Sequence, residues 1–319
     1  MNRYLITGFS GFVSRHFLDY LEMLQEPVSV MGIDINPPEF KSEGRNHVSV
    51  DFQKIDLLDR NGLEKIIVIF QPHYILHLAS FSSVAFSWKN PVISFQNNTN
   101  IFLNLLEAVR SVNPSIRILS IGSSEEYGNL SGCDAVFREE DDLNPVSPYA
   151  VARVSQEMLS KVYVKGYGLD IVMTRSFNHM GPGQKETFVI ASFAKRLVEM
   201  RNRDASPRRL PTGDITQVRD FVDVRDVVRA YDGLLRGGRK GEIYNVCSGV
   251  GHSLKELVQQ MLAILDMKVL LETDESLIRP NDNKIIVGSN EKIKRDIGWC
   301  PEIPLEQSLK DVIDFWKRH

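Results

Sequence analysis

The chain has 319 residues, of which 43% are hydrophobic and 25% charged, so it is long enough for one large or two smaller domains and is too apolar for a disordered chain. The formal net charge is -3 and the sequence holds no basic run, which argues against a nucleic-acid partner. No apolar run is long enough to cross a bilayer, and the amino-terminal residues lack the basic region and cleavage site of a signal peptide. With three scattered cysteines, Cys133, Cys247 and Cys300, we expect a cytoplasmic protein with reduced thiols and no membrane partner.

The first predicted elements are a strand, a tight turn and a helix. Apolar residues from Tyr4 to Ile6 lead into Gly8 and Gly11, after which apolar residues recur at helical spacing. Such a turn directs backbone N–H groups and the positive end of a helix at one place, which suits a pyrophosphate. Gly8 allows the sharp turn and Gly11 lets a phosphate approach, while Ser14 replaces the third glycine of the usual fingerprint. The residues expected to hold a dinucleotide here are Gly8, Ser10, Gly11, Phe12 and Val13.

A carboxylate ends the second predicted strand. This strand, from Val28 to Ile33, runs into Asp34 and Ile35, about twenty residues beyond the glycines, where a carboxylate accepts hydrogen bonds from an adenosine ribose. A carboxylate there repels a 2′-phosphate, so the sequence favours NAD(H), with NADP(H) as the alternative. A surface turn with a solvated aspartate is the plainer interpretation, but the glycines and the aspartate together favour a dinucleotide site.

Strands and helices alternate through the first half of the chain. After Asp34 we predict a strand at 52–56, a helix at 63–70, a strand at 74–78, a helix at 91–112, a strand at 116–121, a helix at 148–167 and a strand at 170–175. This alternation predicts an α/β fold, a Rossmann-type doubly wound parallel sheet. Ligands of such sheets bind beyond the carboxyl ends of the strands, where this chain has small and polar residues. Those expected near a cofactor are Asp56, Leu57, Leu78, Ala79 and Ser80.

The second half loses the regular alternation. We predict helices at 189–202, after 224, at 254–265 and at 304–316, a polar loop at 203–209, and a strand at 243–246. This mixture predicts a smaller mixed α/β substrate domain interleaved with the end of the first domain. The expected division is a dinucleotide-binding domain of residues 1–176 with about 214–247, and a nucleotide-sugar-binding domain of residues 177–213 and 248–319.

Tyr149 and Arg153 are the leading candidates for chemistry. They stand one turn apart near the start of a predicted helix, so their side chains share a face. A cation beside a phenol favours the phenolate, which makes the phenol a usable acid or base. Ser123, at the end of the preceding strand, can donate a hydrogen bond to the same substrate oxygen. Taken alone, an ordinary tyrosine at a helix start beside a solvated arginine is the commoner interpretation.

Several segments together resemble the extended short-chain dehydrogenase/reductases that modify nucleotide sugars. The resemblance covers essentially the whole chain and is strongest to the GDP-4-keto-6-deoxy-D-mannose reductases. It rests on Gly8-x-x-Gly11, Asp56-Leu57, Ser123 four residues before Tyr127 and Tyr149-x-x-x-Arg153, and on the longer segments 77–84, 121–128, 176–184 and 244–249.

The resemblance implies NAD(P)H-dependent reduction of the C4 keto group of a nucleotide-activated 6-deoxy sugar, with a GDP-linked sugar as substrate. Tyr149 would protonate the C4 oxygen, Ser123 would polarise the carbonyl, and arginines would hold the diphosphate. The implied catalytic residues are Ser123, Tyr149, Arg153 and Glu125. The implied cofactor residues add Ile35, Asn98, Tyr149 and Arg153 to those given above. The implied substrate residues are Ser82, Ser123, Ser124, Asn178, Val189, Arg219 and Arg279.

Arg153 is the main departure from the family, which has lysine there. Arginine keeps the charge but stays protonated, so it is a poor proton relay, and we expect an active but slower enzyme. One alternative is a nucleotide-sugar 4,6-dehydratase of the GDP-mannose type on the same fold, and Glu125, which stands where dehydratases keep their base, does not separate the two functions. The segment Gly181–Gln184 lacks the arginine pair of GDP-mannose dehydratases, which argues against it. The other alternative is a non-catalytic protein that binds cofactor or nucleotide sugar.

Two further expectations concern metals and oligomers. The three cysteines are scattered and not paired in the sequence, so no metal site is predicted. The resemblance implies a homodimer that packs the helices predicted at 91–112 and 148–167 into a four-helix bundle.

Overall fold

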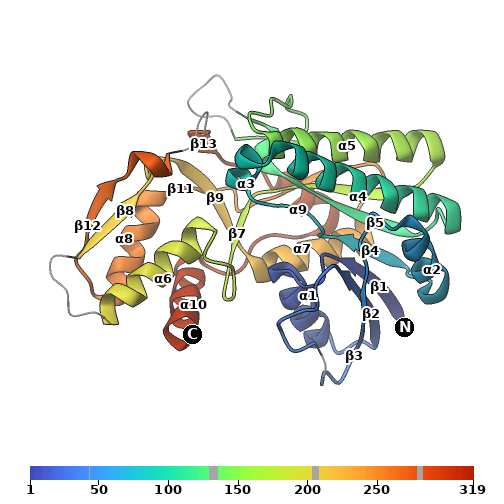
Figure 1. Cartoon of the computed structure of the whole chain (residues 1–319), viewed down its shortest axis with the longest axis horizontal. Helices are drawn as coiled ribbons and strands as arrows, with labels where there is room; N and C mark the ends of the chain where they lie inside the picture. Colours follow the sequence, from blue (N-terminus) through green and yellow to red (C-terminus); the bar gives the residue numbers. More distant parts are fainter. Residues whose placement is uncertain (43, 129–135, 203–207, 279–282) are drawn as a thin grey trace.

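A seven-stranded, all-parallel sheet is the main element of the fold and lies on the right of Figure 1. The computed structural model describes residues 1–42, 44–128, 136–202, 208–278 and 283–319. The strands follow the order β3-β2-β1-β4-β5-β6-β10, and all of them are parallel. The sequence order of the strands switches sides between β1 and β4, and ligands of such sheets bind beyond the carboxyl ends of the strands at this switch point. They are β1 (Asn2–Thr7), β2 (Val28–Asp34), β3 (Val48–Lys54), β4 (Tyr74–His77), β5 (Arg117–Ser123), β6 (Asp170–Ser176) and β10 (Ile243–Val246).

Helices cover both faces of this sheet because its strands are apolar on both sides. In β1, Tyr4 and Ile6 join the core beneath one helical layer and Leu5 joins the core beneath the other, as the two-residue period of a strand requires. One layer contains α1 (Phe12–Met23), α7 (Val224–Gly237) and α9 (Glu291–Ile297). The other contains α2 (Arg60–Phe70), α4 (Pro91–Val112) and α5 (Pro148–Tyr167), with the short α3 (Val84–Lys89) beside them (Figure 1). The predicted Rossmann-type sheet is confirmed.

A smaller mixed α/β part lies on the left of Figure 1. Its four-stranded sheet comprises β7 (Asn178–Met180), β9 (Val218–Asp223), β11 (Gly251–Ser253) and β13 (Ile285–Ile286), and β8 (Arg209–Thr212) pairs with β12 (Leu270–Thr273). The helices α6 (Val189–Asn202), α8 (Leu254–Leu265) and α10 (Leu305–Arg318) share one apolar core. Two short 3-10 helices, η1 (Ser124–Glu126) and η2 (Glu275–Leu277), complete the elements of the described chain. None of the helices in the described ranges is long and apolar enough to span a membrane.

The long elements begin and end close to where the sequence predicts them. The helices at 91–112, 148–167 and 189–202 have the expected bounds. The strand predicted at 52–56 is wrong in its bounds, because β3 covers Val48–Lys54 and leaves Asp56 in the following turn. In β3, buried or half-buried Val48, Val50 and Phe52 alternate with exposed residues, which is the pattern of an edge strand.

Candidate active site

Two glycines shape the turn after β1. Gly8 has a φ of +68°, in the left-handed region that favours glycine, and a Cβ there would lie 2.6 Å from the backbone nitrogen of Ala79. A Cβ at Gly11 would lie 3.0 Å from the carbonyl oxygen of Gly8. Ser14 is fully buried, and its hydroxyl donates to that carbonyl at 3.2 Å, so the serine at the third fingerprint position fastens the turn.

The start of α1 suits an anion. Gly11 is the N-cap, no side chain in the described residues caps the helix, and its first turn holds no acidic residue. The positive end of the helix is therefore not neutralised by its own sequence. Phe12 and Val13 form its first turn, half-buried, next to this end. The turn fits the pyrophosphate of a dinucleotide.

Asp34 is fixed beside the glycine turn. Its Oδ2 accepts from the backbone N–H of Ser10 at 3.0 Å and its Oδ1 from that of Asn36 at 3.1 Å. The hydroxyl of Ser10 donates to the Asn36 carbonyl at 2.5 Å, which closes the group, and Ile35 is 52% exposed at its edge. A carboxylate held in this way can accept hydrogen bonds from a ribose and repels a phosphate.

The segment after β4 is braced from two sides. The backbone N–H of Ala79 donates to the Thr7 hydroxyl at 3.3 Å. Asn98 on α4 is buried, accepts from the backbone N–H of Phe81 at 2.7 Å and donates to its carbonyl at 3.3 Å. Asn98, a predicted cofactor residue, thus uses its amide to hold the loop that carries Ser80.

The other predicted cofactor residues follow β3 and β4. The carboxylate of Asp56 accepts from the backbone N–H of Leu58 at 2.9 Å. Leu57 is buried, and its carbonyl accepts from the Asn104 amide at 3.0 Å. Leu78 is half-buried directly after β4. All three lie at the carboxyl end of the sheet, where the glycine turn also lies.

Arg153 joins the cofactor side of the site to α5. The residue is 4% exposed, and its guanidinium donates four hydrogen bonds. Nε donates to the Tyr149 hydroxyl at 3.2 Å and Nη2 to the Ser80 hydroxyl at 2.6 Å. Nη1 donates to the Ile121 carbonyl at 2.9 Å and to Oε1 of Gln156 at 2.7 Å. Since these acceptors come from β5, from the segment after β4 and from α5, one cation ties together three predicted parts of the site.

Tyr149 and Ser123 each keep a proton to donate. Tyr149 is 6% exposed and accepts from Arg153, so its own phenolic proton can go elsewhere. Ser123 ends β5, is 8% exposed, and its hydroxyl accepts from the backbone N–H of Glu125 at 3.3 Å. Two such hydroxyls at the end of the sheet are suited to polarise and protonate a carbonyl oxygen.

The predicted substrate residues are spread over both parts of the fold. Asn178 lies on β7, which pairs with β9, the strand of Arg219. Arg219 is 6% exposed and lies along its own strand, where it donates to the Val218 carbonyl at 3.0 Å and to the Gln217 side chain at 3.3 Å. Ser124 is buried, Val189 is half-buried at the start of α6, Ser82 is exposed, and Arg279 lies outside the described residues.

Three polar residues of the site were not predicted. Asn283 is fully buried and its amide donates to Glu125 at 3.2 Å, a contact between distant segments with no local sequence signal. Gln156 stands three residues after Arg153 on one helix face, a spacing that could have indicated it. Glu126 stands three residues after Ser123, which is the spacing of a capping box.

His77, at the end of β4, is neutral near pH 7. His77 is buried, its Nδ1 lies 2.8 Å from the Thr7 hydroxyl, and burial lowers its pKa to about 3. Within the described ranges, no group of three or more His, Cys, Asp or Glu could hold a metal ion.

Known proteins similar to this chain are nucleotide-sugar enzymes. Residues 5–312 match the model of the family described as GDP-mannose 4,6 dehydratase. The GDP-6-deoxy-D-mannose reductase of Pseudomonas aeruginosa is 32% identical over 315 residues, which cover 99% of this chain and 97% of that protein.

Solved structures of similar proteins match the fold over nearly the full length of this chain. The structure of RMD from Pseudomonas aeruginosa complexed with NADPH is 31% identical, covers 100% of both chains and has a TM-score of 0.86. The UDP-glucose 4-epimerase of Thermus thermophilus in complex with NAD is 28% identical, covers 98% of both chains and has a TM-score of 0.84. With a family match over nearly the whole chain, the protein belongs to the family described as GDP-mannose 4,6 dehydratase, within the extended short-chain dehydrogenase/reductases.

Proposed function

We propose that the protein is a nucleotide-sugar ketoreductase, which reduces the C4 keto group of GDP-4-keto-6-deoxy-mannose with a reduced nicotinamide cofactor. The observation that carries this proposal is the hydrogen bond from Arg153 to the Tyr149 hydroxyl, made by a buried cation that also bonds Ser80 beside the glycine turn. The similarity to the GDP-6-deoxy-D-mannose reductase of Pseudomonas aeruginosa supports the choice of sugar and nucleotide.

In this proposal each residue has one task. The glycine turn, Asp34 and the segment 78–80 hold the cofactor, which supplies the hydride when bound. Tyr149 gives its phenolic proton to the C4 oxygen, and Ser123 donates a hydrogen bond to that oxygen. Arg153 stays protonated and stabilises the phenolate that remains. Because a guanidinium does not release its proton near neutral pH, water reprotonates Tyr149.

The proposed cofactor is NAD(H), with NADP(H) as the alternative. The backbone N–H groups of Ser10 and Asn36 donate to the Asp34 carboxylate and orient it. Turning this carboxylate away from a 2′-phosphate would break both hydrogen bonds. The Pseudomonas aeruginosa structure holds NADPH, so the preference rests on the residues of this chain and not on that relative.

We also propose that different ranges of the chain bind the cofactor and the nucleotide sugar. Residues 1–176 with 214–247 form the dinucleotide-binding domain, and residues 177–213 with 248–319 bind the nucleotide sugar. Asn178 and Val189 lie in the second of these ranges, on β7 and α6. Arg219 lies within 214–247, but its strand β9 pairs with β7 in the smaller sheet, so we assign its side chain to the sugar side.

We further propose a homodimer formed through α4 and α5. The two helices lie side by side on one face of the sheet (Figure 1). Both helices expose apolar side chains. The exposed residues are Val92, Ile93, Phe95, Val151, Met158 and Val162. Packing against a second copy would remove this apolar surface from water. Analytical ultracentrifugation should give a dimer for the unmodified protein and a monomer for Val162→Glu; a monomer in both would exclude the dimer.

The second candidate function is a 4,6-dehydratase. It is favoured by the description of the matched family and by Glu125, whose carboxylate lies at the end of β5 next to Asn283. Incubation with GDP-4-keto-6-deoxy-mannose and with GDP-mannose separates the two functions. A ketoreductase consumes reduced cofactor with the keto sugar only, whereas a dehydratase turns GDP-mannose into a keto sugar without net cofactor consumption. Cofactor binding without turnover of any keto sugar would favour a non-catalytic protein.

A further inference from the structure

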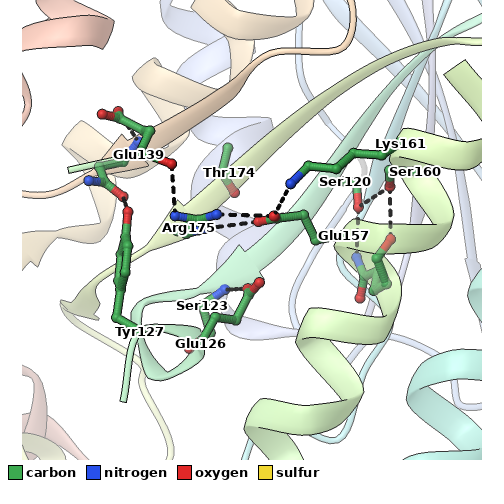
Figure 2. Close-up of polar contacts among 12 residues, drawn as sticks. Ser120, Ser123, Glu126, Tyr127, Glu139, Glu157, Ser160, Lys161, Thr174 and Arg175 are labelled. Atoms are coloured by element: carbon green, nitrogen blue, oxygen red, sulfur yellow. Dashed lines mark hydrogen bonds and ion pairs between the residues drawn. The ribbon is translucent and has the colours of Figure 1, made fainter. Parts of the chain in front are cut away.

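Ser123 and Glu126 hold each other in a capping box at the end of β5. Oε1 of Glu126 accepts the backbone N–H of Ser123 at 2.6 Å (Figure 2). The Ser123 hydroxyl in turn accepts the backbone N–H of Glu126. Glu126 is fully buried. We infer that Glu126 is a positioning residue of the reductase site, whose carboxyl group fixes Ser123 as a hydrogen-bond donor to the keto oxygen of the substrate. This inference rests on the proposed ketoreductase function.

The fold leaves a specific space for this carboxyl group. A Cβ at Gly122 would lie 2.4 Å from Oε1 of Glu126 and 2.4 Å from the carbonyl oxygen of Thr174. The carboxyl group therefore occupies room between β5 and β6 that exists only because residue 122 is glycine. The match between Gly122 and Glu126 makes the carboxyl part of the strand end that presents Ser123.

The capping box leaves the Ser123 hydroxyl able to act as a hydrogen-bond donor. A hydroxyl has one proton to donate and two lone pairs that accept. The Ser123 oxygen accepts from the backbone N–H groups of Glu125, at 3.3 Å, and Glu126. With its lone pairs directed at the backbone, the hydroxyl is left with its proton to offer. This is the state required for polarising a keto group.

Burial, and after it the negative charge of Glu157, keep Glu126 neutral. On α5, Glu157 accepts from Lys161 at 2.8 Å, and on β6, Arg175 donates to Glu157 at 2.9 and 3.0 Å (Figure 2). The charge of Arg153 on α5 also acts on Glu126. The charges of Lys161 and Arg175 are thus paired with the carboxylate of Glu157. Burial first, and then the charge of Glu157, raise the pKa of Glu126 to about 8. Its Oε2 is buried without a hydrogen-bond partner in the described part of the chain, which a neutral acid tolerates better than a carboxylate.

A neutral carboxyl group suits the reaction, and a charged one opposes it. Hydride addition builds negative charge on the keto oxygen next to Ser123. An ionised Glu126 would add its negative charge close to this oxygen and beside the carboxylate of Glu157. The ionised carboxylate would also compete for the cations Arg175 and Arg153. Turnover should therefore fall as the pH rises through about 8, the pKa of Glu126.

The test compares three variants with the unmodified protein. Glu126→Gln keeps an acceptor oxygen and cannot ionise, so it should keep turnover near pH 7 and lose the fall around pH 8. Glu126→Ala removes the acceptor and should lower kcat by about ten- to a hundredfold at every pH, somewhat less than removal of an oxyanion donor, with cofactor affinity unchanged. Glu139→Gln is the control, because burial also raises the pKa of Glu139 while its carboxylate bonds the Asn245 backbone at 2.8 Å. Turnover of Glu139→Gln should therefore still fall as the pH rises through about 8.

Two outcomes would overturn the inference: unchanged kcat in Glu126→Ala, or an alkaline fall that persists in Glu126→Gln. Absence of turnover in the unmodified protein would instead contradict the proposed function. Urea unfolding from pH 5 to 9 then tests the neutral carboxyl group without substrate. The unfolding midpoint of Glu126→Gln relative to the unmodified protein should rise with pH up to about 8, and a difference independent of pH would contradict a neutral Glu126.

Discussion

Substitution of Arg153 separates the structural work of this residue from its chemical work. Methionine removes all four hydrogen bonds of the guanidinium. The Ile121 carbonyl still accepts from Gln156 at 3.1 Å, and the half-exposed Ser80 hydroxyl can turn to water. Oε1 of Gln156, in a side chain 1% exposed, is left without its donor, which costs about 1–3 kcal/mol of unfolding free energy.

The chemical effect should be larger. A unit charge about 4 Å from a phenolate contributes about 4 kcal/mol at an effective dielectric constant of about 20. Converted at about 1.4 kcal/mol for each tenfold change, this corresponds to as much as about a thousandfold in rate. Arg153→Met should therefore nearly abolish turnover and move the pH–rate profile to higher pH. Arg153→Lys keeps the charge and can relay a proton, so it should keep or raise turnover.

Steady-state rates between pH 6 and 10 and urea unfolding of the three proteins decide the matter. We expect kcat of Arg153→Lys to equal or exceed that of the unmodified protein, and both values to be far above kcat of Arg153→Met. The unfolding free energies of the three proteins should differ by only a few kcal/mol. If Arg153→Met left the rate and its pH profile unchanged, Arg153 would be a bystander and the reasoning would fail. If the unmodified protein were inactive and lysine restored turnover, the non-catalytic alternative would gain support.

Three further predictions concern Tyr149, Asp34 and Glu126. Tyr149→Phe should lower kcat by about a hundred- to ten-thousandfold with little change in the dissociation constant of the cofactor, and turnover at the unmodified rate would remove Tyr149 from the mechanism. Fluorescence titration should show tighter binding of NADH than of NADPH, with a smaller gap in Asp34→Ala; tighter NADPH binding by the unmodified protein would contradict the role of Asp34. Because the pKa of Glu126 rises from its usual 4.5 to about 8 on folding, the folded protein holds a proton that the unfolded chain releases between these values. Unfolding free energy should therefore fall with rising pH across this window, by up to about 1.4 kcal/mol per pH unit, and Glu126→Gln should remove that slope.

Most of the larger sheet could be predicted because its signals are local. Helices such as α4 and α5 begin with proline and carry apolar residues at helical spacing, and β4 is a short apolar run that precedes them. The smaller sheet gave little local signal. β13 has two residues, Ile285 and Ile286, and exists because it pairs with β9, far earlier in the chain. No periodicity can be read from two residues.

The same distinction holds for the candidate site. The glycine turn and Asp34 could be predicted from spacing alone, because a strand end and the turn after it are contiguous. The bonds of Arg153 to Ser80 and Ile121 could not, since they depend on β4 and β5 lying side by side. The capping box of Glu126 had a local signature, a serine followed three residues later by a glutamate, but only the burial of both residues shows how it bears on the site.

In the proposed function, this chain delivers hydride from a nicotinamide cofactor to the keto carbon of a nucleotide sugar. The most direct test uses NADH that carries deuterium at the transferred position, with GDP-4-keto-6-deoxy-mannose as substrate and mass spectrometry and NMR of the product. We expect one deuterium per sugar, located at C4, with transfer strongly slowed in Tyr149→Phe. A product without deuterium at C4, or label transfer of equal rate in Tyr149→Phe, would contradict it.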